Sequence, residues 1–561
     1  MKDNQIVSFD VYDTLIERIL PEEKIYKILS IKYNITNFVK IRLEAEETAK
    51  KVFHIYTIND IYKYIDLKNK NDILNDEIEL EIKNTKVNVI GEKLYDKYKD
   101  NSYLVCTSDM FFSSDIIKRI LVKNGYDKIQ KIFVSCDYKA NKKDRKLFKI
   151  LKSEFHNKSI IHIGDSIRSD YLNSILCGIK PVFINKNKKN IYAAKLTKDE
   201  YLEKIGYYVF GPMIFEFCLW LNDKKNNNIL FLSREGDLIC DCYNKMFEVN
   251  EKVFYVSRKS VLGGIMYFLV NENKLYDVIK LLRKTRNEKI IDLLKRMNLF
   301  KMNDIFTNDF INQEVNDKNI DTLIKIIYDN KGIVLQSLKN DYINFDKYVS
   351  SLITEDTTLI DVGWNGSMQK LLKLYFNLKN IKIEGLYLGC MNSNDKDGYL
   401  FNESNDTGLT ILNYSGILEL IFMPDYGSII GYKNENNEIV PLHEKYEFSA
   451  ETKNDILSIQ NGYMKYIEDR KKIGLVSLYD KTEIVNIVNE LGVNPNNYDI
   501  KYFGSIEFYD NGKFEKLLNY NDGFIKGFKK SEWKIAYLKK KFKIPLPYNR
   551  FLIHIRRSLN K

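Results

Sequence analysis

Short apolar segments separated by helical sequence constrain the fold of this chain more than any other feature. In the N-terminal part they fall at residues 6–9, 103–108, 131–136, 159–165 and 181–185. Between them, apolar residues recur every three to four positions, which is the spacing of amphipathic helices. Strands that alternate with helices form parallel sheets covered on both faces. Residues 1–195 are therefore predicted to form an α/β domain.

The segment that follows the first strand is long and helical in pattern. Residues 17–100 carry apolar side chains at helical spacing over several successive stretches. Ligands of open parallel sheets bind at the carboxyl ends of the strands. We interpret this segment as a helical cap over the carboxyl end of the first sheet.

The alternation of strands and helices starts again in the second part of the chain. Strand-like runs at 228–233, 252–257, 357–363 and 383–389 predict a second α/β domain over residues 196–445, with a helical insertion at 265–350. Residues 446–561 read as helical and irregular, and they end in a basic tail at 523–561. The predicted fold class is thus α/β, with two sheet domains and a helical C-terminal region.

Size and composition exclude several classes of protein. A chain of 561 residues that is 44% hydrophobic can bury two sizeable cores and is not disordered. Its longest apolar stretch, residues 207–221, is too short to span a bilayer and contains Pro212 and Glu216. The N-terminus shows no signal-peptide pattern, and the seven scattered cysteines fit reduced thiols. We therefore expect a cytoplasmic protein.

The positive charge belongs to the tail alone. Residues 523–561 hold twelve Lys or Arg and one acid, which leaves 75 basic and 75 acidic residues elsewhere. This mixture of basic and apolar residues predicts attachment to an anionic membrane surface at the inner face, whereas docking of the apolar side chains on the protein is the alternative. Nucleic acid is not an expected partner, because no binding motif is present. The apolar residues concerned are Trp533, Ile535, Tyr537, Leu538, Phe542, Ile544, Phe551, Leu552 and Ile555.

Polar side chains follow the strands of the first domain. Asp10, Ser108 and Asp165 stand where strands end, and Lys142 and Asp170 lie in the segments that follow. Carboxylates at one edge of a sheet can attack phosphorus or hold Mg²⁺, and a hydroxyl and an amine can stabilise phosphoryl oxygens. An aspartate at a strand end is also common as a turn or helix-capping residue.

Four segments in order, FDVYDTL, TSDMFF, KANKKDRKLF and IGDSIRSD, resemble the motifs of the haloacid dehalogenase (HAD) superfamily. The resemblance covers about residues 1–190 and implies a Rossmann-like sheet with a helical cap. It also implies an aspartyl-phosphate intermediate and bound Mg²⁺. The residues that it assigns are Asp10, Ser108 and Lys142 for catalysis, and Asp10, Asp165 and Asp170 for the metal. Lys139 and Lys143 are neighbouring candidates for the lysine.

Position 12 departs from the family pattern. HAD phosphatases carry an aspartate two residues after the nucleophile, and this chain has Tyr12 there. That acid protonates the leaving group and later activates water, and such general acid–base catalysis contributes about 10²–10⁴-fold. The family's dehalogenases carry a tyrosine at this position but need no metal. Asp13, one position further on, is a candidate substitute for the missing acid. Because Tyr12 replaces that acid, three functions stay open for this domain: a slow phosphatase, a phosphotransferase, and a binding domain without catalytic activity.

The second domain repeats the pattern of charged residues after strands. Arg234, Arg258 and Asp361 follow three of its predicted strands, and Gly363 and Gly366 follow the last. Arginine forks and glycine-rich turns together make a candidate anion site. Internal ion pairs of these arginines with neighbouring acids are the alternative.

The two domains in this order also resemble a group of bacterial HAD hydrolases associated with surface-polysaccharide biosynthesis. GPMIFEF, FLSREGD, DVGWNGSMQ and LELIFMPDYGS carry this likeness, which extends to about residue 435. It implies an Mg²⁺-dependent hydrolase or phosphotransferase acting on a phosphorylated sugar or glycan intermediate. A scaffolding protein, or a glycosyl- or phosphoribosyl-type transferase with its site in the second domain, are the alternatives. The oligomeric state cannot be deduced from the sequence.

Overall fold

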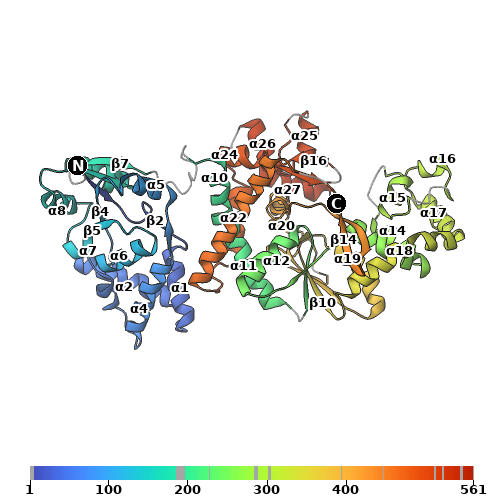
Figure 1. Cartoon of the computed structure of the whole chain (residues 1–561), viewed down its shortest axis with the longest axis horizontal. Coiled ribbons are helices and arrows are strands. Elements are labelled where there is room, and N and C mark those ends of the chain that lie inside the picture. The colour runs from blue at the N-terminus through green and yellow to red at the C-terminus, as the bar shows by residue number, and fades with distance from the viewer. Residues whose placement is uncertain are drawn as a thin grey trace. The chain divides into compact units, whose positions relative to one another are not determined.

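The computed structural model divides into two compact units (Figure 1). Unit 1 comprises Met1–Thr197 and Lys465–Leu478, and unit 2 comprises Lys198–Met464 and Tyr479–Lys561. The predicted C-terminal region 446–561 is thus divided between the two units. The structure describes residues 5–184, 196–225, 228–282, 288–300, 305–392, 394–445, 448–510, 513–520, 523–543 and 547–559.

Unit 1 contains a parallel five-stranded sheet in the order β5-β4-β1-β6-β7. Its strands are β1 (Gln5–Phe9), β4 (Tyr103–Ser108), β5 (Ile129–Val134), β6 (Ser159–Gly164) and β7 (Lys180–Phe183). After β1 the chain builds outward on one side through β4 and β5, and then on the other side through β6 and β7. The order therefore reverses at β1, and its carboxyl end is the place where open α/β sheets bind ligands.

Helices connect these strands and cover the sheet. They are α6 (Ser114–Lys123), α7 (Ser135–Tyr138), α8 (Lys146–Glu154), the π-type turn η1 (Ile167–Leu172) and α9 (Asn173–Leu176). One side of the sheet packs its apolar residues, among them Ile6, Val105 and Phe133, against Leu147, Phe148 and Leu151 of α8. Burial on both faces explains why the strands read as nearly continuous apolar runs.

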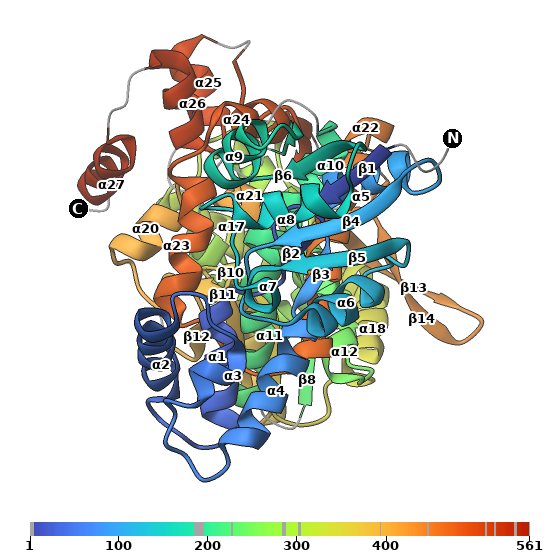
Figure 2. The same ribbon diagram turned by 90° about the vertical axis from the view of Figure 1, so that its left-hand side faces the viewer.

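The segment predicted as a helical cap contains five helices and a short ribbon of strands. The helices α1 (Glu22–Lys32), α2 (Phe38–Phe53), α3 (Ile58–Tyr62) and α4 (Lys70–Lys83) group together beside the sheet (Figures 1 and 2). The antiparallel strands β2 (Ile16–Arg18) and β3 (Thr85–Val87) pair at their base, and α5 (Val89–Tyr98) leads back to β4. The two chain ends of the cap are therefore joined by backbone hydrogen bonds, which helical periodicity alone did not predict.

Unit 2 contains a second parallel five-stranded sheet, in the order β12-β11-β10-β8-β9. The four predicted strands are present as β8 (Asn228–Leu232), β9 (Lys252–Phe254), β10 (Thr357–Trp364) and β11 (Ile383–Cys390), and the short β12 (Lys396–Gly398) adds a fifth. The fold class of two α/β sheets followed by helices is thus confirmed.

A helical insertion lies between β9 and β10, as predicted. It consists of α13 (Arg258–Asn271), α14 (Leu275–Leu282), α15 (Ile290–Arg296), α16 (Asn308–Ile311), α17 (Asp317–Asp329) and α18 (Lys331–Ser350). Its apolar faces join those of β8, β9, β10 and α19 (Ser367–Phe376) in one continuous core. The insertion is therefore part of the same hydrophobic core as the second sheet.

Further helices and two hairpins complete unit 2, except that the long helix α22 (Ala450–Ile473) belongs to unit 1 from Lys465 onward. N-terminal to the sheet lie α10 (Lys198–Ile205), the π-type turn η3 (Gly206–Phe210) and α11 (Gly211–Lys224), and α12 (Glu235–Phe247) follows β8. After β12 come α20 (Asp406–Ile411), α21 (Ser415–Leu420), β13 (Ile429–Glu435), β14 (Glu438–His443), α22 (Ala450–Ile473), α23 (Lys481–Gly492), α24 (Asn497–Phe503), β15 (Glu507–Asp510), β16 (Lys513–Lys516), α25 (Phe524–Lys530), α26 (Lys534–Phe542) and α27 (Tyr548–Leu559). Within the described residues, no helix is both long and apolar enough to cross a membrane.

Five of the nine apolar residues named in the basic tail are packed inside unit 2, whereas Phe542 and Phe551 are exposed. Trp533 is fully buried, and its Nε1 donates a hydrogen bond to the carbonyl oxygen of Gly492 at 2.8 Å. Ile535, Tyr537, Leu538 and Leu552 are buried as well, whereas Ile544 lies outside the described residues. Docking on the protein therefore accounts for these side chains.

Candidate active site

Three strands of unit 1 deliver polar residues to one edge of the sheet. Asp10 follows β1, and its backbone N–H donates to the carbonyl oxygen of Ile163 at 2.8 Å. Ser108 ends β4 and Asp165 follows β6, and both side chains are buried. A Cβ on Gly164 would lie 2.5 Å from the Asp170 side chain, so only glycine lets that carboxylate approach the strand end.

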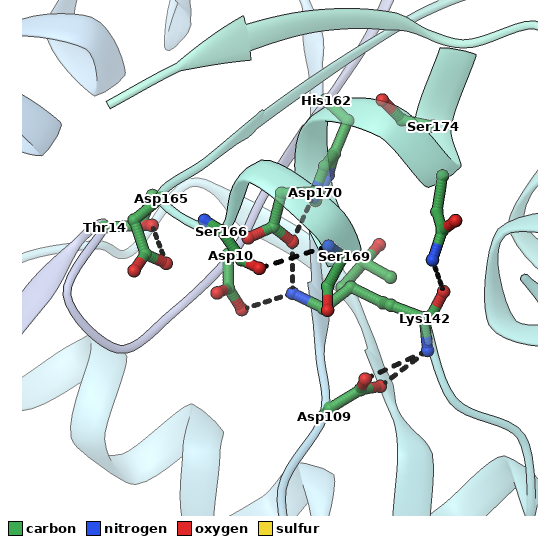
Figure 3. A network of polar contacts seen from close by, with 12 residues as sticks. Asp10, Thr14, Asp109, Lys142, His162, Asp165, Ser166, Ser169, Asp170 and Ser174 are labelled. Carbon is green, nitrogen blue, oxygen red and sulfur yellow. Dashed lines mark hydrogen bonds and ion pairs between the residues drawn. The ribbon is translucent and has the colours of Figure 1, made fainter. Parts of the chain in front are cut away.

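Lys142 joins two of these carboxylates (Figure 3). Its Nζ lies 2.9 Å from Oδ1 of Asp10 and 2.6 Å from Oδ1 of Asp170. The residue is 3% exposed, whereas Lys139 and Lys143 are exposed, so the structure selects Lys142 among the three candidates. It precedes α8 instead of opening it, and its backbone N–H donates to both carboxylate oxygens of Asp109.

Burial and this shared lysine divide the charge between the two aspartates. Burial raises the pKa of Asp10 to about 7, against the opposing effect of Lys142. Burial would also raise the pKa of Asp170, but Lys142 and then His162 outweigh it and hold that pKa below its usual value. Burial would lower the pKa of Lys142, yet Asp10, Asp170 and Asp109 raise it above its usual value. Asp170 is therefore ionised, while Asp10 needs a further cation to be fully ionised at neutral pH.

The residues present fit a divalent metal. Asp10, Asp165 and Asp170 each offer an oxygen, and these three oxygens lie within 4.8 Å of one another. Asp165 and Asp170 are buried, and Oδ1 of Asp165 accepts a hydrogen bond from Thr14 at 3.4 Å. Carboxylate oxygens are the ligands that Mg²⁺ prefers. A cation among them would also supply the positive charge that ionises Asp10.

His162 belongs to this network, although the scattered histidines gave no reason to expect it. It is fully buried in β6, with Nε2 3.0 Å from Oδ1 of Asp170 and Nδ1 2.9 Å from Oγ of Ser8. Burial lowers the pKa of His162, so the ring is neutral. An ionised carboxylate only accepts hydrogen bonds, so Nε2 carries the proton and Nδ1 accepts from Ser8. Ser8 in turn lies 2.8 Å from Oγ1 of Thr107.

This chain of hydrogen bonds runs across three strands behind the carboxylates. It links Thr107 in β4, Ser8 in β1 and His162 in β6 to Asp170. Oδ2 of Asp170 accepts a further hydrogen bond from the backbone N–H of Ser166 at 2.9 Å. The orientation of Asp170, and through it that of Lys142, is thus fixed from the sheet. The available sequence signal was a histidine inside an otherwise apolar strand, in register with Ser8.

Tyr12 is engaged with the cap. Its hydroxyl donates to Oε1 of Glu81 in α4 at 2.9 Å, and the Arg18 guanidinium lies 4.4 Å from the centre of its ring. Burial, followed by Glu81, raises the pKa of Tyr12 well above its usual value, so the phenol stays protonated. Asp13 lies in the turn after β1 with a φ of 55° and is not part of the three-carboxylate group. In this conformation Tyr12 is thus held by the cap and is not placed as an acid or base for Asp10.

A second contact joins the cap to the loop after β4. The backbone N–H of Ile58 donates to the carbonyl oxygen of Phe111 at 2.9 Å, and the Tyr56 ring stacks on the Phe111 ring. The guanidinium of Arg42, which is fully buried in the cap, lies 5.6 Å from the same ring. Two residues of the motif-bearing loops, Tyr12 and Phe111, are thus fixed by cap side chains.

In unit 2 the structure brings together two of the three predicted anion-site residues. Arg234 follows β8 and lies 3.3 Å from the Glu235 carboxylate. Burial and then Glu235 raise the pKa of Asp361 in β10 well above its usual value, against a smaller lowering effect of Arg234. Arg258 instead starts α13 with an exposed side chain. Arg234 therefore has an acidic neighbour in Glu235.

Glu419 is a further acid near this group, and it leads to a testable pH dependence. Burial and then Glu235 raise the pKa of Glu419 to about 7, and its Oε1 accepts from Nε1 of Trp364 at 2.8 Å. Because the folded-state pKa is raised, the folded protein binds an extra proton between about pH 4.5 and 7. The contribution of Glu419 to stability is present below this window and is lost as the pH rises through it.

We expect Glu419→Gln to remove this dependence. Glutamine cannot ionise, so the variant should be more stable than the parent by about 2 kcal/mol at pH 8 and no more stable at pH 4.5. Urea unfolding of both proteins at the two pH values measures the difference. Glu435→Gln, at an exposed position, serves as the control. An equal difference between Glu419→Gln and the parent at both pH values would contradict the assignment.

Comparison with known proteins gives limited information. No protein-family model matches the chain, and no curated protein matches its sequence. Among solved structures, a protein described as the HAD-hydrolase YfnB from Bacillus subtilis, bound to magnesium, matches 33% of this chain and 91% of its own, with 16% identity and a TM-score of 0.26. A HAD phosphatase from Thermococcus onnurineus matches 34% of this chain and 90% of its own, with 20% identity and a TM-score of 0.26. Similarity this low says nothing about the reaction. The argument for a reaction must therefore come from the geometry of the site.

Proposed function

We propose that unit 1 is a HAD-type, Mg²⁺-dependent phosphoryl-transfer domain with Asp10 as its nucleophile. The observation that carries this proposal is the position of Lys142 between Asp10 and Asp170, at 2.9 and 2.6 Å, with Asp165 in the same group. A structural aspartate at a strand end needs no buried lysine and no two further buried carboxylates. This assembly stands at the carboxyl end of β1, where the sheet order reverses.

The residues support a two-step reaction on a phosphate monoester. An oxygen of Asp10 forms a bond to phosphorus while the bond from phosphorus to the leaving oxygen breaks, and that oxygen takes a proton from water. Water or an acceptor hydroxyl then attacks the aspartyl-phosphate, and Asp10 is released as a carboxylate. Asp10, Asp165 and Asp170 would hold Mg²⁺, which supplies charge stabilisation to the phosphoryl oxygens. Lys142 neutralises charge at Asp10, and Ser108 would donate to a phosphoryl oxygen.

The position of Tyr12 argues that the second step is slow. A protonated phenol that is bonded to Glu81 neither activates water nor protonates a leaving group. Without that acid, the reaction lacks about 10²–10⁴-fold of general acid–base catalysis. Monoesters with good leaving groups should therefore react best, and the phosphorylated enzyme should accumulate. A phosphorylated sugar or glycan as the substrate rests on the sequence resemblance alone.

The test is a panel of phosphate monoesters, sugar phosphates among them, incubated with the full chain. We expect Mg²⁺-dependent release of phosphate that is fastest for aryl phosphates, and an acid-stable, hydroxylamine-sensitive phosphoryl group on the protein. Activated sugar donors test the transferase alternative for unit 2 in parallel. Absence of both turnover and phosphorylated protein with every substrate would favour a scaffolding role and overturn the proposal.

Supplying the missing acid should accelerate dephosphorylation. Tyr12→Asp would place a carboxyl two residues after the nucleophile, and Glu81→Gln in the same chain removes the like charge beside it. We expect the phosphorylated double variant to lose its phosphoryl group about 10–10²-fold faster than the parent, because an acid–base group is added. The half-life of the radiolabelled phosphorylated protein measures this.

Two controls separate this effect from a change in the cap. Tyr12→Phe alone removes the hydrogen bond from Tyr12 to the cap, and Glu81→Gln alone removes the charge of its acceptor, but neither adds a carboxyl near Asp10. We expect neither to shorten the half-life. If the parent protein already turns over common sugar phosphates rapidly, another group fills the role and the interpretation of Tyr12 is wrong.

A further inference from the structure

Among the described residues, four apolar side chains of the basic tail are left exposed by the packing of unit 2: Phe551 of α27, at 58%, and three residues of α25 and α26. Ile525 is 70% exposed, Phe524 is 42% exposed and Phe542 is 47% exposed. The rings of Phe524 and Phe542 meet at 5.6 Å between centroids, so the start of α25 and the end of α26 lie together. The two helices are neighbours in both ribbon views (Figures 1 and 2). We call these three residues the apolar tip.

Lysines flank the apolar tip in the sequence. Exposed lysines stand within four residues of Ile525 or Phe542, at positions 526, 529, 540, 541 and 543. We call these five the basic rim. The remaining basic residues of the tail include several that bond within the fold: Lys534 Nζ donates to the Phe528 carbonyl oxygen at 2.8 Å, and Arg556 Nε donates to Oδ1 of Asn413 at 2.8 Å. The single acid of the tail, Glu532, is not exposed.

From this arrangement we propose that the apolar tip and the basic rim form a membrane-contact surface for anionic lipid. Exposed apolar residues ringed by polar ones mark interaction sites. Lysines attract anionic headgroups, and apolar side chains at the end of two helices can enter the boundary between headgroups and acyl chains. The contact needs no unfolding, unlike insertion of the buried Trp533 or Leu538.

Lipid fits this surface better than nucleic acid. Nucleic acid binding without sequence preference uses basic side chains along a backbone and aromatic side chains on which bases stack. Here the most exposed apolar residue is Ile525, an aliphatic side chain that offers no stacking platform. The rings of Phe524 and Phe542 also pack edge to face against each other, so they are not presented as separate platforms for bases. An insertion point flanked by charge is the geometry of a peripheral membrane contact.

Vesicle co-sedimentation of the full chain tests the proposal. Vesicles of phosphatidylglycerol and phosphatidylcholine should pellet the protein at low salt, whereas phosphatidylcholine alone should not, and added salt should release it. Ile525→Ser, at the most exposed position, should reduce the bound fraction without lowering the melting temperature. Replacing Lys529, Lys541 and Lys543 with glutamate should weaken partitioning by about 10²-fold or more, because each cation near the surface contributes on the order of fivefold. Truncation is unsuitable, since the tail contributes the buried Trp533 to the fold.

Matched variants on the helical insertion keep the test specific. Ile333, which is 60% exposed, is changed to serine, and exposed lysines of the same region are changed to glutamate: Lys318, Lys325 and Lys339. These controls should bind vesicles as well as the parent does. If the control variants lost vesicle binding to the same extent, the effect would depend on the net charge of the protein alone, and the assigned membrane-contact surface would be wrong. Binding of a DNA duplex that exceeds vesicle binding, or no vesicle binding by the parent, would overturn it as well.

Discussion

Replacing Asp10 with asparagine should abolish phosphoryl transfer. The amide keeps the shape of the side chain but cannot attack phosphorus, so turnover should fall by about 10³-fold or more, and no phosphorylated protein should form. The amide also removes a carboxylate from the group that would hold Mg²⁺ and a partner of Lys142. Phosphate release and radiolabelling from the same aryl phosphate measure both losses.

The control for this variant is a change of the same chemistry outside the site. Asp115→Asn, at an exposed position in the first turn of α6, should leave turnover unchanged. Melting temperatures of both variants show whether the fold persists. If the Asp10→Asn variant released phosphate at the parent rate in the presence of Mg²⁺, Asp10 would not be the nucleophile. This conclusion would hold even if other residues of the site act on phosphate esters.

Replacing Lys142 with methionine should damage both stability and reaction. Methionine has a similar length but no charge, so Asp10 and Asp170 would face each other in a buried site without their shared cation. Removing one member of a buried ion pair typically costs about 3–5 kcal/mol. We expect a loss of this size in the free energy of unfolding at pH 7.5 without Mg²⁺. Phosphoryl transfer should fall by about 10²-fold or more, as charge stabilisation is lost.

The pH dependence of this variant distinguishes lost charge from lost packing. Without Lys142, the pKa of Asp170 loses its main lowering influence and should rise. A raised folded-state pKa makes stability decline as the pH rises, so the deficit of Lys142→Met should shrink towards pH 4. A deficit of equal size at both pH values would indicate packing alone. Lys143→Met, at the exposed neighbour, should stay within about 0.5 kcal/mol of the parent.

The sequence by itself predicted the two sheets and the residues of the site in unit 1. Parallel strands that are buried on both faces consist of short, nearly continuous apolar runs. The strands β1, β4, β6, β8 and β10 could therefore be recognised in the sequence. Asp10, Asp165 and Asp170 could be proposed because they follow strands that end at the same edge of one sheet, whereas Lys142 was implied by the motif resemblance, with Lys139 and Lys143 as rivals. The local sequence pattern is enough to predict such features. In a parallel sheet, residues that follow different strands lie at the same edge, however far apart they are in the sequence.

Only the tertiary structure decided which neighbours each side chain meets. His162 was not among the predicted site residues, and the register of β1 and β6 places it between Ser8 and Asp170. The sequence showed that Tyr12 replaces the expected acid, but its hydrogen-bond partner, Glu81, lies 69 residues away in the cap. Contacts of this kind depend on packing between distant segments, which no local periodicity encodes.

The basic tail shows the same division most clearly. Its composition determined that the chain's net positive charge is concentrated in residues 523–561, and it offered nine apolar side chains as candidates for a membrane. The fold placed Trp533 and its neighbours in a hydrophobic core, because burial removes apolar surface from water. It left Phe524, Ile525, Phe542 and Phe551 exposed. Composition determined the charge of the surface, and packing determined which apolar residues that surface contains.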